Sequence, residues 1–262
     1  MSSYVERVSS VKRLYWHLYW RLRAWRDGRS DTQAELAFLC RHDLGIPVMG
    51  RVGLLRRFAE VSHRLEPLHT QQEMLEVAAA ILRFPRQLPG VIVEAGCCQG
   101  GSTAKLSLCA ALTGRRLVVF DSFEGIPEND EVQVDLTSAR TVFTKGQYAG
   151  SLDEVRGNVR AYGDLSVCDF VKGWFSDTMS GFDQPVCVTY LDVDLVSSTK
   201  DCLRGLYPRL VAGGTLFSQD GHLSNVAALF ADDEFWREEL GVKRPVVRGL
   251  GQRKLISIVK PR

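Results

Sequence analysis

Long apolar runs, strong net charge and repeats are all missing from this sequence of 262 residues. Because no run of about 18 or more uncharged apolar residues occurs, we expect no membrane-spanning helix. The N-terminus lacks a basic tip followed by an apolar core, so the sequence does not predict a secretory signal. A formal net charge of +2 gives no electrostatic argument for a nucleic-acid partner. The length fits one α/β domain with an extension.

Cysteine pairs with the spacing of a metal or redox site are also missing. The seven cysteines are an odd number, none forms a C-x-x-C motif, and Cys97 and Cys98 are adjacent. These features argue against a disulfide framework and against a zinc site. We therefore predict reduced thiols in a cytoplasmic protein.

The segment VIVEAGCCQGG, residues 91–101, is typical of a buried strand, a glycine turn and the start of a helix. Its spacing is Gly-x-x-x-Gly-Gly, whereas dinucleotide sites use Gly-x-Gly-x-x-Gly. Glu94 stands before the turn, where its carboxylate would repel a diphosphate but match the methionyl ammonium of S-adenosylmethionine (SAM). We therefore interpret the segment as a SAM site; a turn that binds nothing is the alternative. The residues predicted to bind the cofactor here are Glu94, Ala95, Gly96, Gly100, Gly101 and Ser102.

Strand-like and helix-like patterns then alternate along the chain, which predicts a parallel sheet with helices on both faces. A helix expected over 70–82 begins with Thr70 and Glu73 at capping-box spacing. The last two strand-like runs, 245–247 and 255–259, are separated only by a short glycine-rich loop, so they must pair antiparallel. The expected fold is a Rossmann-like α/β fold with a mostly parallel sheet of seven strands that ends in an antiparallel C-terminal hairpin. The expected strands are 91–94, 117–120, 167–171, 186–191, 215–218, 245–247 and 255–259, and the expected later helices are 152–162, 198–210 and 226–240.

Aromatic residues and leucines recur at helical spacing between arginines over residues 11–25. We expect this helix to cover the active site or to contact another subunit. An anionic membrane surface and nucleic acid are the alternatives. Residues 1–65 are thus predicted to be an N-terminal helical extension.

Acidic residues follow four of the expected strands, namely Glu94, Asp121, Asp192 and Asp220. Ligands of an open parallel sheet bind beyond the carboxyl ends of its strands, so these acids should meet at one edge. Asp121 ends the second strand, where a carboxylate can accept hydrogen bonds from both ribose hydroxyls. Five further residues are predicted to contact the cofactor: Ser122, Phe123, Gly173, Trp174 and Asp192. Either Trp174 or Phe175 would cover the adenine.

Six strings of residues carry a specific resemblance to a known family: EAGCCQGGST, FDSFEGIP, SLDEVRGNV, VKGWFSDTM, YLDVDLVSSTKDCLRGLYPRL and GGTLFSQD. Together they resemble the macrocin/mycinamicin O-methyltransferase family of bacterial natural-product enzymes. The resemblance implies a class I SAM-dependent methyltransferase domain over residues 66–262, often oligomeric. It also implies a magnesium ion and, as the acceptor, a hydroxyl on a sugar or aromatic part of a small secondary metabolite.

A magnesium ion would take oxygen ligands, and Asp192 and Asp220 at neighbouring strand ends can supply two. The family pattern has two consecutive aspartates after the fifth strand, whereas this chain has Gln219 and then Asp220. Gln219 can offer its amide oxygen, but the site loses one negative charge. We interpret Asp194 as a cap of the following turn at Ser197.

No histidine occurs over residues 128–150, where some family members carry one and where a lid over the acceptor is expected. Lys145, Gln147 and Tyr148 in this stretch are predicted to set specificity. His222 and Asp192 are the candidate catalytic proton acceptors.

Three other functions stay open at this point. Methylation of nitrogen or carbon would follow if Gln219 abolishes metal binding. A SAM-binding partner protein without catalysis would use the aromatic N-terminal helix for assembly. A dehydrogenase is disfavoured by the glycine spacing and the terminal hairpin.

Overall fold

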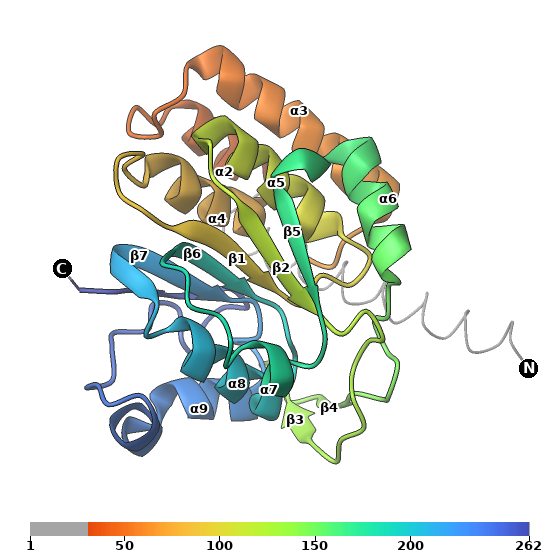
Figure 1. The fold of residues 1–262 in the computed structure, drawn as a ribbon, viewed down its shortest axis with the longest axis vertical. Coiled ribbons are helices and arrows are strands. Elements are labelled where there is room, and N and C mark those ends of the chain that lie inside the picture. The colour runs from red at the N-terminus through yellow and green to blue at the C-terminus, as the bar shows by residue number, and fades with distance from the viewer. Residues whose placement is uncertain (1–30, 262) are drawn as a thin grey trace, which may run out of the picture.

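The computed structural model describes residues 31–261, so the predicted helix over residues 11–25 lies outside the described part. Within this part, the main sheet has six strands in the order β5-β2-β1-β6-β7-β8, and every neighbouring pair is parallel except β7 with β8 (Figure 1). Its strands are β1 (Val91–Ala95), β2 (Leu117–Asp121), β5 (Cys168–Lys172), β6 (Val186–Leu191), β7 (Leu210–Ser218) and β8 (Ile256–Val259). The predicted α/β fold class is confirmed.

Helices cover both faces of the sheet, with α2 to α6 on one side and α7 to α9 on the other (Figure 1). Successive residues of a strand point to opposite faces, and accordingly Ile92 joins the core under α3, α4 and α5 while Val93 joins the core under α8 and α9. The helices are α2 (Asp31–Leu39), α3 (Val48–Leu65), α4 (Gln71–Arg83), α5 (Gly101–Thr113), α6 (Leu152–Tyr162), α7 (Phe175–Thr178), α8 (Val196–Leu206) and α9 (Ser224–Ala231). The described residues also form a 3-10 turn (Leu165–Val167) and a π-helical turn (Phe235–Glu239).

The expected strand over 245–247 is not a strand in the structure. Its only pairing among the described residues is a single bridge next to it, in which the N–H of Arg248 donates to the carbonyl of Ser257 at 2.8 Å. Pro245 has no N–H to add to a ladder, and Val246 is 82% exposed, so it buries little that would stabilise a strand. The antiparallel C-terminal pair is therefore β7 with β8.

The expected lid, residues 128–150, contains a small hairpin that the sequence patterns did not reveal: β3 (Val132–Val134) and β4 (Arg140–Val142). Glu131 anchors this segment, because its carboxylate accepts hydrogen bonds from the N–H groups of Val196 (2.7 Å) and Ser197 (3.0 Å). The start of α8 is thus capped by Glu131, and the expected cap, Asp194, does not fill that place.

Helix α4 begins with the predicted capping box. The Thr70 hydroxyl accepts the N–H of Glu73 at 3.2 Å, and the Glu73 carboxylate accepts the N–H of Thr70 at 2.7 Å. Two N–H groups that would otherwise lack a helical partner are satisfied in this way.

Replacing Thr70 by alanine is expected to lower the free energy of unfolding by about 0.5–2 kcal/mol, because one cap hydrogen bond is lost. Urea denaturation followed by circular dichroism measures the change. Thr70→Ser keeps a hydroxyl at the same place and should stay close to the unsubstituted protein. Equal stability of all three proteins would show that the cap contributes nothing.

Candidate functional site

A cavity opens at the carboxyl ends of the parallel strands, and residues that follow β1, β2, β5, β6 and β7 line it together. Of the residues predicted to bind the cofactor or a metal ion or to act in catalysis, those lining the cavity are Gly96, Gly101, Ser102, Asp121, Ser122, Gly173, Trp174, Asp192, Asp220 and His222. The other predicted residues, which are not among those lining it, are Glu94, Ala95, Gly100, Phe123 and Gln219. The structure thus brings the predicted strand-end residues to one edge of the sheet.

The glycine turn, residues 96–101, lies close to the chain that leaves β6. Gly96 has φ +82°, and a Cβ atom there would lie 2.0 Å from the carbonyl oxygen of Asp192. Gly100, at φ +84°, forms the N-cap of α5. Glycine at position 96 meets two demands that other residues cannot, a positive φ and close contact with the backbone of the neighbouring strand end, so it lets the turn pack against the end of β6.

Glu94 is completely buried near the end of β1. Burial raises the pKa of its carboxyl group to about 8, and the nearby hydroxyls of Ser102 and Thr103 lower it in part. A cationic ligand group placed near Glu94 would favour the ionised form. The Glu94 carboxyl group would therefore lose its proton more readily when the methionyl ammonium of SAM lies near it, which agrees with its predicted role.

Asp121 holds the glycine turn in place. One of its carboxylate oxygens accepts the N–H of Cys97 at 2.7 Å, and the other accepts the N–H of Phe123 at 2.7 Å. Each oxygen keeps a second lone pair, so the carboxylate can still accept hydrogen bonds from ligand hydroxyls in the cavity. The sequence analysis missed the bonds that tie Asp121 to the turn.

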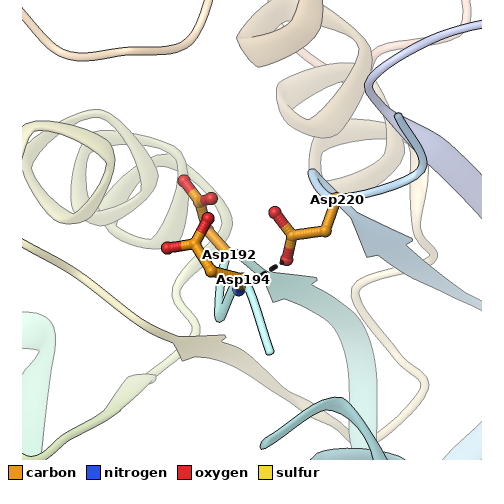
Figure 2. Close-up of side chains that lie close together, drawn as sticks. All are labelled: Asp192, Asp194 and Asp220. Carbon is orange, nitrogen blue, oxygen red and sulfur yellow. Dashed lines mark hydrogen bonds between the residues drawn. The ribbon is translucent and has the colours of Figure 1, made fainter. Parts of the chain in front are cut away.

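Three carboxylates come together at the ends of β6 and β7: Asp192, Asp194 and Asp220, which we call the acidic cluster. Oxygen atoms from all three lie within 4.8 Å of one another, and Figure 2 shows the side chains gathered around a common space. Asp194 was not predicted as a member. Its φ of +61° is unusual for a non-glycine residue; the Asp-x-Asp spacing after a strand was the signal that could have suggested it.

Asp220 is 1% exposed and connects the cluster internally. Its Oδ2 accepts the N–H groups of Val193 and Asp194, both at 3.0 Å, whereas its Oδ1 has no hydrogen-bond partner among the described residues. Burial and the neighbouring Asp192 raise the pKa of Asp220 to about 7. Burial also raises the pKa values of Asp192 and Asp194. An all-oxygen donor set with an unsatisfied oxygen fits a hard divalent cation such as Mg²⁺.

Gln219, the residue before Asp220, is fully buried. Its Nε2 donates to Glu73 Oε2 at 2.9 Å, and its Oε1 has no partner in the described part of the chain. Glu73 comes from α4, far away in the sequence, and the sequence analysis gave it no role beyond the capping box.

His222 and Lys254 also line the cavity. Burial and the nearby Lys254 ammonium hold the pKa of His222 well below its usual value, so its imidazole is neutral at pH 7 and binds a proton less readily than an ordinary histidine. Lys254 lowers the pKa values of the cluster acids. It was missed because it comes from the loop before β8, which shows no recognisable motif.

Substitution of Glu94 by glutamine is expected to flatten the pH dependence of stability. Because the pKa of Glu94 rises from 4.5 to about 8 on folding, the folded state binds the proton more tightly, and stability falls as pH rises between these values. Removing this group should reduce the slope by up to about 1.4 kcal/mol per pH unit between pH 5.5 and 7.5.

Urea unfolding at several pH values measures that slope. Glu128→Gln, on an exposed side chain, is the matched control. A slope unchanged by Glu94→Gln would contradict the raised pKa.

Residues 66–248 match the sequence profile of the family described as Macrocin-O-methyltransferase (TylF). Over 140 residues the chain is 39% identical to the 8-demethyl-8-(2,3-dimethoxy-alpha-L-rhamnosyl)-tetracenomycin-C 4'-O-methyltransferase of Streptomyces olivaceus. Over 145 residues it is 32% identical to the demethyldecarbamoylnovobiocin O-methyltransferase of Streptomyces niveus. Each alignment covers 51% of this chain and 53% of the relative, so the chain spans about half the length of the curated relatives it matches.

Solved structures share the fold. The O-methyltransferase NovP has a TM-score of 0.64 at 20% identity, covering 81% of this chain and 100% of that one. The calicheamicin methyltransferase CalS11 has a TM-score of 0.56 at 19% identity, and the match covers 80% of this chain and 92% of CalS11. At these identities the likeness supports the fold alone. The family profile, however, spans more than half of the sequence, and the chain therefore belongs to the macrocin O-methyltransferase (TylF) family.

Proposed function

We propose that this protein transfers the methyl group of SAM to a hydroxyl on a sugar or aromatic part of a small bacterial natural product. The observation that carries this proposal is the shared cavity, in which the glycine turn, Asp121 and the acidic cluster meet. Family membership supports the reaction class. A relative named for 4'-O-methylation of a rhamnosyl tetracenomycin supports a glycosylated acceptor.

SAM would supply a methyl group on a sulfonium that a nucleophile can attack. For its binding we assign the backbone of Gly96 and Gly101, with Asp121 accepting hydrogen bonds from the ribose hydroxyls and Trp174 beside the adenine. An ammonium bound near Glu94 would favour the ionised form of this buried carboxyl group, whose pKa of about 8 leaves it mostly protonated without a cation. These groups orient the cofactor, because in-line transfer requires the acceptor oxygen close to the methyl group and aligned with it.

We assign Asp192, Asp194 and Asp220 to hold a magnesium ion, with Gln219 as a further oxygen donor. A bound Mg²⁺ would act as a Lewis acid that lowers the pKa of the acceptor hydroxyl. The unsatisfied Oδ1 of Asp220 supports this assignment.

The acceptor hydroxyl must lose its proton to a nearby base. His222 lines the cavity, and this position supports it as a proton acceptor, although its lowered pKa makes it a weaker base than an ordinary histidine. Asp192 is the second candidate: the Tyr190 hydroxyl donates to its Oδ2 at 3.4 Å and orients it.

We assign the lid segment, residues 128–150, a role in acceptor specificity, and the position of Phe143, Gln147 and Tyr148 in the cavity lining supports this assignment. Lys145, by contrast, pairs with Glu128 at the surface. Among the described residues, no helix is long and apolar enough to cross a membrane. A homo-oligomer and a cytoplasmic location stay predictions, as do the division of the chain at residue 65 and the role of the N-terminal extension.

Asp121→Asn should weaken binding of S-adenosylhomocysteine (SAH), because the ribose hydroxyls lose a charged acceptor. Such hydrogen bonds contribute about 1.5–3 kcal/mol, or roughly a 10- to 150-fold change in dissociation constant. Isothermal titration calorimetry measures it. Asp169→Asn, on an acid that pairs with Arg116 at the surface, is the control. Unchanged affinity in Asp121→Asn would remove Asp121 from the cofactor site.

Asp220→Asn should lower turnover at least about 10- to 100-fold, the range for weakened metal sites, while SAH affinity stays nearly the same. Transfer from labelled SAM to a panel of glycosylated and phenolic acceptors measures turnover, with Asp201→Asn on the surface of α8 as the control. EDTA should likewise lower the activity of the unsubstituted protein. Normal turnover in the variant, or after EDTA, would contradict the cation assignment.

A further inference from the structure

A buried hydrogen bond joins α4 to the end of β7. Glu73 Oε2 accepts the Nε2–H of Gln219 at 2.9 Å as well as the N–H of Thr70 at 2.7 Å. Glu73 is 9% exposed and Gln219 is 0% exposed, so water competes little for this contact. The bond connects two residues that are 146 positions apart, and it is not needed for the capping box, which Thr70 completes.

This contact fixes which way the Gln219 amide points. A glutamine amide has a donor end and an acceptor end, and a carboxylate facing it can only accept. The Nε2 of Gln219 therefore turns toward Glu73, and Oε1 turns away from it. The Oε1 atom of Gln219 is buried and has no hydrogen bond to any described residue. The same is true of the Oδ1 atom of the next residue, Asp220.

Glu73 also explains why position 219 carries an amide. A carboxylate at this position would meet the Glu73 carboxylate without a donor between them, and buried like charges repel strongly. The charge of Glu73 already acts on Asp192, where it opposes the effect of Lys254. Glutamine keeps an oxygen donor at position 219 without adding a third negative charge beside Glu73 and Asp192.

We propose that Glu73 is a positioning residue of the cation site, which holds Gln219 so that its Oε1 can serve as a ligand beside Asp220. The inference rests on the proposed function, in which the acidic cluster binds a divalent cation. In this inference Glu73, on α4, does not touch the cation itself. Its carboxylate pairs with the amide of Gln219 and so orients that ligand.

The first test measures Mn²⁺ binding to the full chain by the electron paramagnetic resonance signal of free Mn²⁺. Glu73→Met removes the acceptor at similar length, and we expect about 10- to 100-fold weaker Mn²⁺ binding, as for other outer partners of metal ligands. Thr70→Ala disturbs the same helix start but leaves the Gln219 contact, so its Mn²⁺ affinity should equal that of the unsubstituted protein. SAH affinity should be the same in all three proteins, which shows that each is folded.

The second test exchanges the charges. Gln219→Asp alone should bind Mn²⁺ no more tightly than the unsubstituted protein, because its new carboxylate faces Glu73. Combined with Glu73→Gln, it should bind more tightly than the unsubstituted protein, because the amide at position 73 donates to the new carboxylate and the site gains a charge. Equal affinity of the single and double variants would overturn the pairing.

The outcomes also separate this inference from the proposed function. If the unsubstituted protein binds Mn²⁺ and Glu73→Met binds it equally well, the role of Glu73 is wrong and the cation site stands. If the unsubstituted protein binds SAH but no Mn²⁺, the cation site and the role of Glu73 both fail, whereas the cofactor site stands.

Discussion

Backbone hydrogen bonds continue beyond the ends of the parallel strands, and the rest of the site depends on them. Each strand-end residue donates its N–H to the neighbouring strand: Gly173 to Asp121, Gly96 to Phe120, Asp192 to Ala95 and Gln219 to Leu191, all within 2.8–3.0 Å. This ladder sets the first residue after each strand in one row. The close contact of Gly96 with the Asp192 carbonyl then leaves no room for a side chain between two of these ends.

Carboxylates gather at this edge of the sheet, where water is scarce, which is unfavourable unless their charges are compensated. Three features of the chain compensate in part: backbone N–H groups donate to Asp121 and Asp220, the Lys254 ammonium lies near the cluster, and raised pKa values leave some acids protonated. A cationic ligand would complete the compensation. The same electrostatic situation would favour both of the proposed ligands, a sulfonium cofactor with an ammonium group and a divalent ion.

Much of this arrangement followed from the sequence, because parallel topology alone brings strand ends to one edge. Strand β6 and helix α6 have the predicted bounds, and the glycine turn lies where its spacing placed it. Contacts between distant segments could not be predicted. Asp194 turns into the cluster through an unusual backbone conformation. Glu73 was expected only as a capping-box residue, and Lys254 comes from a loop without a motif. The strand expected over 245–247 is reduced to a bridge because tertiary burial, and not pattern, decides whether a short run pairs.

The most direct measurement is a crystal structure of the full chain with SAH and Mn²⁺, using anomalous scattering to locate the metal. The account predicts SAH along the glycine turn with its ribose on Asp121, and an anomalous peak between Asp192 and Asp220. SAH bound elsewhere, or a cavity edge with neither ligand, would contradict it.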